Sequence, residues 1–132
     1  MSNRPVVSII MNCHNGQKFL SDAIQSVINQ SFKNWELVFY DNFSKDKSYN
    51  ILKKFKDKRI KYYKSKKFLN LYAARNQAVI KARGKYIAFL DTDDLWEKNK
   101  LKIQLNLIEN SQFSMIYCNY YTLRNNIKLK RY

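Results

Sequence analysis

The stretch Tyr86-Ile87-Ala88-Phe89-Leu90-Asp91-Thr92-Asp93-Asp94 decides the fold. Residues 86–90 are mostly apolar and predict a short buried strand, and three carboxylates follow within the next four positions. Carboxylates crowded at a strand end repel one another unless a cation lies between them or water solvates them. A hard divalent ion prefers oxygen ligands and often shares them with substrate phosphates. The stretch therefore indicates either a metal-assisted phosphate site or a solvated acidic turn.

Further strands are predicted on both sides of this stretch. Continuous apolar runs predict buried strands over 6–11 and 35–40. Basic and apolar residues alternate over 59–64, which is typical of an edge strand with one wet face. A fifth strand is predicted over 113–121, and Asn125-Asn126 are predicted to turn the chain back into a short basic strand.

Helices are predicted between these strands. Apolar residues at helical spacing predict helices over 18–30 and 97–110, and a small-residue-rich helix is predicted over 70–83. Ser44 is positioned to cap a further helix around residue 52, and Gly84 is positioned to end the helix over 70–83.

This alternation predicts an α/β fold in which a parallel sheet has helices on both faces. Ligands of such sheets collect at the carboxyl ends of the strands. Polar residues are predicted at three of those ends, namely 12–15, 41–42 and 91–94. We therefore expect these three segments to meet at one edge of the sheet.

Length and composition fit a single domain. The chain has 132 residues, and its content of 45% hydrophobic and 15% aromatic residues excludes a disordered chain. No apolar run approaches the ~20 residues that span a bilayer, and the amino-terminal segment predicts a first strand, not a signal peptide. The two cysteines, Cys13 and Cys118, lack metal-site spacing, and the one histidine, His14, cannot complete a zinc site. Reduced thiols in a cytoplasmic protein are expected.

The net charge of +15 predicts attraction to anions such as nucleotides, nucleic acid or an anionic membrane. Nine basic residues against one acid lie between Lys53 and Lys67, and a second basic cluster lies in the tail 122–132. A solvated lysine-rich face explains these clusters without any partner. A nucleic-acid or anionic-surface binding module without catalysis is the alternative function that this charge favours.

The residues at the three strand ends suit a nucleotide diphosphate. Asp41 can accept from a base N–H, Asp91 can take ribose hydroxyls, and Asp93 can ligate a metal that the diphosphate also ligates. Arg75 can reach a phosphate or the base, or it can simply pair with a neighbouring acid. Gly16 and Gly84 are the only glycines, which argues against a GxGxxG dinucleotide fold and against a P-loop.

Four segments, in order, resemble the amino-terminal, nucleotide-binding half of a family-two glycosyltransferase with the GT-A fold. They are 7–15 with the following helix, 35–46, 70–76 with its Ala74-Arg75-Asn76, and 84–96 with its Asp-x-Asp. The resemblance covers about 5–121 and implies a Rossmann-like three-layer α/β/α domain with a mainly parallel central sheet. It also implies that residues 1–132 form one truncated domain that lacks the acceptor-binding half.

The resemblance implies an inverting transfer of a sugar from a nucleotide-diphosphate donor, UDP-linked, to a hydroxyl of a glycan or lipid-linked acceptor in surface polysaccharide synthesis. The implied cofactor is Mn²⁺ or Mg²⁺, and the implied location is the cytoplasm, at the inner face of the membrane. The residues that match nucleotide-sugar contacts are Cys13, His14, Asn15, Asp41, Arg75, Asp91, Thr92 and Asp93, and the matching metal residues are Asp93, Asp91 and Asp94.

The sequence departs from the family pattern in two respects. Asn12 and His14 replace the usual Pro and Tyr of the first loop, and Asn42 replaces the second Asp of an Asp-Asp pair. Family members also carry a catalytic base in the acceptor-binding half, so the base is expected beyond Tyr132. We therefore expect this chain to bind donor nucleotide better than it turns over.

Overall fold

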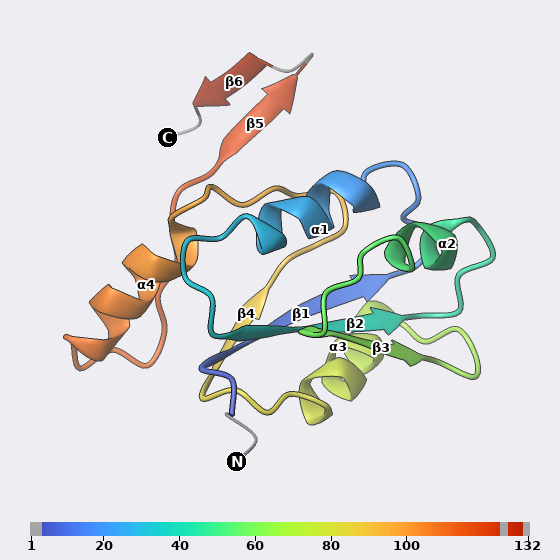
Figure 1. Cartoon of the computed structure of the whole chain (residues 1–132), viewed down its shortest axis with the longest axis horizontal. Coiled ribbons are helices and arrows are strands. Elements are labelled where there is room, and N and C mark those ends of the chain that lie inside the picture. Colours follow the sequence, from blue (N-terminus) through green and yellow to red (C-terminus); the bar gives the residue numbers. More distant parts are fainter. Residues whose placement is uncertain (1–3, 125–126, 131–132) are drawn as a thin grey trace.

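The computed structural model describes residues 4–124 and 127–130. Its centre is a four-stranded parallel sheet built from β1 (Val7–Cys13), β2 (Trp35–Asp41), β3 (Ile60–Lys64) and β4 (Tyr86–Phe89). The strand order is β3-β2-β1-β4. Because all three pairings are parallel, the arrowheads point the same way in Figure 1. The predicted α/β fold with a parallel sheet is confirmed.

The strand register aligns the ends of three strands. Cys13 of β1 pairs with Asp41 of β2, and Asp41 pairs in turn with Lys64 of β3. On the other side of β1, Ile10 pairs with Phe89, and the Leu90 N–H donates to the Ile10 carbonyl. The loops that follow β1, β2 and β3 therefore leave the sheet along one edge, on the right of Figure 1.

Helices cover both faces of the sheet, which gives three layers. On one face, α1 (Leu20–Ile28), α2 (Ser48–Leu52) and α4 (Lys100–Glu109) contribute to the larger apolar core. On the other face, α3 (Leu71–Ile80) packs Ala74 and Ala78 against Ile10 and the β2 residues Val38 and Tyr40. Both alanines are fully buried, because their small side chains let the helix lie close to the sheet.

Several helix boundaries differ from the sequence-based predictions. The Asn70 side chain accepts from the Ala73 N–H and so begins α3 as an N-cap. Ser44 caps no helix, because its hydroxyl accepts from the Asn15 N–H and its own N–H donates to Asp41. The helix α2 starts four residues later, and its N-cap residue, Lys47, makes no capping bond with its side chain.

Gly84 also has a different role from the predicted one. The helix α3 ends with a right-handed C-cap at Lys81, and Gly84 does not have a left-handed backbone. A Cβ at Gly84 would lie 2.5 Å from the Ser8 backbone nitrogen. A glycine is therefore required here because the chain that leads into β4 passes directly over β1.

A buried polar network holds this crossing together. Glu36 of β2 is only 2% exposed and accepts from the Ser8 hydroxyl at 2.7 Å and from the Arg83 N–H at 2.7 Å. The Arg83 guanidinium donates twice to the other Glu36 oxygen, at 3.1 and 2.9 Å. Ser8 also accepts from the Gly84 N–H at 2.8 Å, so one carboxylate and one hydroxyl join β1, β2 and the entry to β4.

The strand β4 is half-buried, not buried on both faces as its apolar sequence predicts. Tyr86 and Ala88 face the larger core, whereas Ile87 and Phe89 are 40% and 53% exposed. The reason is its place at the end of the sheet, where α3 does not cover its second face.

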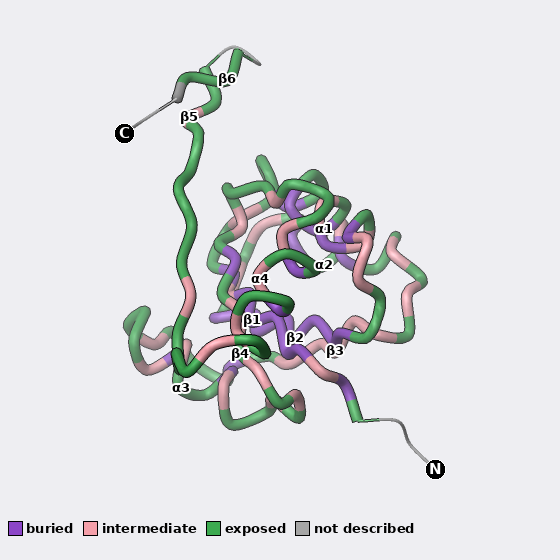
Figure 2. The backbone as a smooth tube through the Cα atoms, turned by 90° about the vertical axis from the view of Figure 1, so that its left-hand side faces the viewer, coloured by how far each residue is buried: buried purple, intermediate pink, exposed green. Residues whose placement is uncertain are grey.

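The predicted fifth strand over 113–121 is wrong for most of its length. Residues 113–120 run as extended chain that pairs with no described strand. A separate antiparallel hairpin follows, made of β5 (Tyr121–Arg124) and β6 (Ile127–Lys130), and it stands away from the sheet in Figures 1 and 2. The predicted short basic strand is thus present, while the turn at 125–126 lies outside the described residues. Within 4–124 and 127–130, no helix has the length and apolar content to cross a bilayer.

Candidate functional site

Hydrogen bonds tie the first two loops at the carboxyl edge together. The Asn15 side chain accepts from the Lys45 N–H at 2.8 Å, and the Asn15 N–H donates to the Ser44 hydroxyl at 3.0 Å. The Gly16 N–H donates to the Ser48 hydroxyl at 3.0 Å. Asn15 has a left-handed backbone with φ of 54°, which asparagine tolerates better than most residues. The first loop is therefore held in one shape by the second.

The Asp46 side chain accepts hydrogen bonds from both loops. It accepts from the Gln17 N–H at 2.9 Å and from the Ser48 N–H at 3.0 Å. Burial opposes ionisation of this carboxyl, but hydrogen bonds from Ser48 and Gln17 outweigh burial and lower its pKa. The charged carboxylate thus fastens the loop that precedes α1 to the start of α2.

Cys13 and His14 follow one another at the end of β1 but face different surroundings. Cys13 is 1% exposed, and burial raises the pKa of its thiol, so it behaves as a small apolar residue. His14 is exposed, its Nδ1 lies 2.9 Å from the Asn42 carbonyl, and its ring lies 4.7 Å from the Phe68 ring. Of the pair, only His14 presents a side chain to a ligand at the edge.

Asp41 is buried and already hydrogen-bonded. Its exposed fraction is 2%, its Oδ1 accepts from the Ser44 N–H at 2.8 Å, and its Oδ2 accepts from the Tyr62 hydroxyl at 3.0 Å. Burial and the bond to Asp41 raise the pKa of Tyr62 far above its usual value. Asp41 therefore organises the end of β2, and it has further lone pairs for a ligand.

The acidic motif after β4 places Asp91 beside α3. Arg75 donates to Asp91 at 2.7 Å, and its guanidinium lies 5.8 Å from the Phe89 ring centroid. The structure shows Arg75 paired with a neighbouring acid. This pairing is one of the two interpretations that the sequence left open. Both side chains are partly exposed, so a ligand at the edge can reach them.

The carboxyl group of Asp94 lies close to the other two carboxylates of the motif. Burial raises the pKa of Asp94, and the negative charges of Asp93 and Asp91 raise it further. The Asp94 N–H donates to the Asp91 carbonyl at 3.2 Å, which closes a turn around Thr92. A cation placed beside this turn would relieve the repulsion.

Thr92 lies against the first loop. A Cβ at Gly16 would come within 3.0 Å of both the Thr92 hydroxyl and the Cys13 sulfur. The acidic motif and the loop after β1 are therefore in contact, and the missing side chain at Gly16 makes room for Thr92. This contact brings the residue that follows the predicted segment 12–15 against the predicted segment 91–94.

The donor set suits a hard divalent ion, with one restriction. Across 4–124 and 127–130, no three His, Cys, Asp or Glu side chains are grouped closely enough to hold a metal by themselves. Mg²⁺ and similar ions are commonly held by one or two carboxylates together with substrate phosphates and water. Since Asp91 is paired with Arg75, the residues fit an ion that Asp93 would hold together with phosphate oxygens and water.

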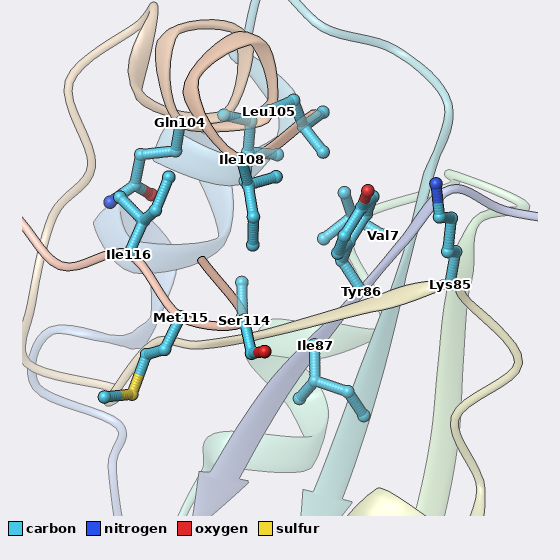
Figure 3. Close-up of a pocket in the computed structure, with 12 residues that line it drawn as sticks. Val7, Lys85, Tyr86, Ile87, Gln104, Leu105, Ile108, Ser114, Met115 and Ile116 are labelled. Atoms are coloured by element: carbon cyan, nitrogen blue, oxygen red, sulfur yellow. The ribbon is translucent and has the colours of Figure 1, made fainter. Parts of the chain in front are cut away.

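A cavity of about 350 Å³ lies elsewhere, between β4 and α4 (Figure 3). Val7, Tyr86, Leu101, Leu105 and Met115 are among its lining residues, and none of the predicted site residues lines it. Its lining takes Val7 from the first residue of β1 and residues 86–88 from β4, and it includes neither Asp41 nor a residue of the acidic motif. It is therefore distinct from the candidate site.

Sequence reasoning missed three residues that shape the site. The Tyr62 hydroxyl on β3 donates to Asp41 on the neighbouring strand β2, and this contact is predictable only once the β2–β3 register is known. Asp46 accepts from the first loop and Gly16 leaves room for Thr92, and both roles depend on how the loops fold. Because the chain has only two glycines, the presence of one at position 16 was a signal that could have identified Gly16.

Comparison with known proteins agrees with this fold and identifies the family. A family model described as "Glycosyl transferase family 2" matches residues 8–132. The Escherichia coli UDP-Glc:alpha-D-GlcNAc-diphosphoundecaprenol beta-1,3-glucosyltransferase WfgD is 39% identical over 121 residues, which are 92% of this chain and 48% of that protein. The putative teichuronic acid biosynthesis glycosyltransferase TuaG of Bacillus subtilis is 36% identical over 80% of this chain and 42% of its own length. The chain thus spans about half the length of these relatives.

Solved structures show the same architecture. The Staphylococcus aureus TarS 1–349 complex with UDP matches with a TM-score of 0.74 and 27% identity, over 78% of this chain and 32% of that one. The mannosyltransferase PcManGT from Pyrobaculum calidifontis, in complex with GDP-Man and Mn²⁺, matches in fold with a TM-score of 0.72 and 18% identity, over 93% of this chain and 37% of that one. The fold is GT-A, and the chain belongs to glycosyl transferase family 2.

Proposed function

We propose that this chain binds the nucleotide-diphosphate sugar donor, UDP-linked, of a glycosyltransferase that acts in surface polysaccharide synthesis. The observation that carries the proposal is the contact between the first loop and the acidic motif at the carboxyl edge. It supports a single site in which the first loop meets the base and the acidic motif meets the ribose and the diphosphate. The name of the E. coli relative, which specifies UDP-glucose, supports the choice of nucleotide.

Each site residue has a proposed role. At the β1–β2 side, His14 and Asn15 frame the base, the Cys13 backbone forms the floor, and Asp41 accepts from a base N–H with a lone pair that Ser44 and Tyr62 leave free. Arg75 exchanges its bond to Asp91 for one to the nucleotide.

On the acidic side, Asp91 accepts from the ribose hydroxyls once Arg75 has released it. Asp93, with Asp94 next to it, would hold Mn²⁺ or Mg²⁺, while Thr92 keeps the turn against the first loop. The bound ion supplies charge neutralisation for the departing nucleoside diphosphate. Transfer with inversion to a hydroxyl of a glycan or lipid-linked acceptor is the reaction that this donor site would serve.

We infer the cellular location of the protein from the proposed acceptor. The two relatives named above for glycan synthesis, one of them acting on a diphosphoundecaprenol-linked sugar, support a place in the cytoplasm at the inner face of the membrane. A net charge of +15 supports peripheral contact with an anionic bilayer there.

Titration of the intact chain with UDP, GDP and CDP, with and without Mn²⁺, tests the donor site. We expect UDP to bind most tightly and Mn²⁺ to strengthen binding about tenfold or more, as a bridging ion should. Asp93→Asn should remove the gain from Mn²⁺, whereas Asp22→Asn, an exposed acid on α1, should leave it intact. Equal, metal-independent binding of all three nucleotides would show attraction by net charge alone and overturn the proposal.

A further inference from the structure

The side-chain amide of Asn12 is buried without a hydrogen bond. Its nitrogen and its oxygen are both shielded from solvent, and neither has a hydrogen-bond partner among residues 4–124 and 127–130. A buried polar atom left unpaired costs free energy, so each such atom in a native protein calls for an explanation. Ser31 and Trp35 have one atom of this kind each, whereas Asn12 has two. Asn12 is therefore equipped to bind a group that the protein itself does not supply.

The Asn12 side chain lies on the α3 face of the sheet. Successive side chains of a strand point to opposite faces, and Met11 and Cys13 belong to the larger core on the α1 face. Ile10, two residues before Asn12, packs instead with Ala74 of α3. Asn12 therefore continues the row of Ile10 toward the carboxyl edge, on the face that α3 covers.

Asn12 also lies where β1 and β4 diverge. The pairing of β1 with β2 runs as far as Cys13, whereas its pairing with β4 ends at Ile10. In the strand order β3-β2-β1-β4, the direction of winding reverses between β1 and β4, and α1 and α3 lie on opposite faces of the sheet. Sheets of this kind bind ligands at such a switch point, outside the carboxyl ends of the strands. An unpaired amide at this point therefore indicates a ligand contact.

The ion pair between Arg75 and Asp91 belongs to the same end of the same face. Arg75 is next to the buried Ala74 on α3, and Asp91 leaves the sheet shortly after the pairing of β4 with β1 ends. Under the proposed function, this pair opens when the donor enters, and Asp91 then takes the ribose hydroxyls. Of the parts of the donor, the ribose is therefore the one assigned to the face on which Asn12 lies.

We propose that Asn12 is a donor-binding residue whose amide hydrogen-bonds the ribose beside Asp91. This inference rests on the proposed function. A carboxylate can only accept hydrogen bonds, whereas an amide both accepts and donates, so the two side chains together can satisfy a neighbouring pair of hydroxyls. The nucleotide gives both amide atoms the partners that they lack in the protein. The family pattern has proline at this position, so the proposed contact is not part of that pattern.

Replacing Asn12 by leucine tests the proposal with two opposite readouts. Leucine has the same branching and no polar atoms, so Asn12→Leu should raise the Tm by about 4 °C. Because the variant also loses the bonds to the ribose, it should bind UDP in the presence of Mn²⁺ about tenfold more weakly. Asn12→Ala, which cannot clash with its neighbours, should lose affinity to the same extent. Circular dichroism checks that both variants are folded.

Ser31→Ala is the matched control. It also removes a buried polar atom that has no partner among the described residues. Ser31 lies before β2, at the opposite edge of the sheet, and its N–H donates to the Lys98 carbonyl. This variant should therefore leave the affinity for UDP unchanged.

Deoxy analogues identify the part of the donor that Asn12 binds. The original chain should prefer UDP to 2′-deoxy-UDP and to 3′-deoxy-UDP. For at least one analogue this preference should shrink about tenfold in Asn12→Ala, because the missing hydroxyl and the missing amide are the two ends of one hydrogen bond. A purely structural role of Asn12 would leave the preference unchanged.

Three results would overturn the inference. A lower Tm in Asn12→Leu with unchanged UDP affinity would show that the amide is paired within the folded protein. Retention of full UDP affinity by Asn12→Ala would refute the contact, while leaving the donor site itself in place. An equal loss of affinity for UDP and for both deoxy analogues would assign Asn12 to another part of the donor. Failure of the original chain to bind UDP is a different outcome, because it would refute the proposed donor site and the ribose contact together.

Discussion

Replacing Glu36 by glutamine tests the network that joins β1, β2 and the entry to β4. Glutamine keeps one oxygen for Ser8 and the Arg83 N–H, but it turns an amide N–H₂ toward the Arg83 guanidinium and so removes two charge-assisted hydrogen bonds. Each such bond contributes about 1.5–3 kcal/mol when buried. The Arg83 side chain is 55% exposed, so solvent screening reduces the sum to about 2 kcal/mol.

The assay is urea unfolding at neutral pH. A loss of about 2 kcal/mol corresponds to a fall in Tm of roughly 8 °C for a chain of this size. Glu109→Gln is the matched control, because that carboxylate lies 4.0 Å from Lys85 with both side chains at least half exposed. It should change the free energy of unfolding by less than about 0.5 kcal/mol.

The pH profile gives a second readout. Burial opposes ionisation of Glu36, but hydrogen bonds from Ser8 and Arg83 outweigh burial and hold its pKa below 4.5. A carboxyl whose folded pKa is depressed stabilises the fold above its unfolded pKa and loses that contribution as pH falls through the folded value. The gap between the original chain and the glutamine variant should therefore close as the pH drops below about 4. A variant within about 0.5 kcal/mol of the original at neutral pH, with a gap that does not change with pH, would refute the reasoning.

Three further substitutions have defined outcomes. Gly84→Ala places a Cβ 2.5 Å from the Ser8 backbone nitrogen, so it should destabilise the fold by about 2 kcal/mol or more in urea unfolding, and an unchanged midpoint would contradict the close approach. Tyr62→Phe removes the donor to the buried Asp41 Oδ2 and should cost about 1 kcal/mol; no loss would mean that Asp41 is satisfied without it. Asp94→Asn should stabilise the chain by a few tenths of a kcal/mol at pH 7, after allowance for solvent screening, because burial and its acidic neighbours raise the pKa of Asp94. The destabilisation by ionised Asp94 appears as pH rises through the pKa of this carboxyl in the unfolded chain, so the original chain and the variant should be equally stable near pH 2. An equal difference in unfolding free energy at pH 2 and pH 7 would argue against repulsion.

The sequence predicted the order of elements because hydrophobic periodicity reports local structure. The buried runs of β1 and β2 and the apolar face of α1 were recognised within about two residues of their ends. The ends of the elements were less predictable, because Ser44 and Gly84 have roles that depend on neighbours distant in sequence. Burial of β4 was overestimated since an apolar sequence does not reveal which strand lies at the end of the sheet.

The candidate site was predictable to the level of segments. The rule that ligands collect at the carboxyl ends of parallel strands placed 12–15, 41–42 and 91–94 together, and the contact between Thr92 and Gly16 agrees. Individual side-chain geometry was not predictable, because the bond from Tyr62 to Asp41 and the pairing of Arg75 with Asp91 depend on strand register and helix placement.

The bond between Arg75 and Asp91 has a consequence for product release. Two groups that are proposed to grip the donor neutralise each other when the site is empty, so entry of a nucleotide exchanges one ion pair for others. The net gain is then smaller than the new contacts alone would give, and the old pair re-forms when the nucleotide departs. In the proposed donor site, the Arg75–Asp91 pair would compete with a bound nucleoside diphosphate for the same two side chains and so weaken its retention.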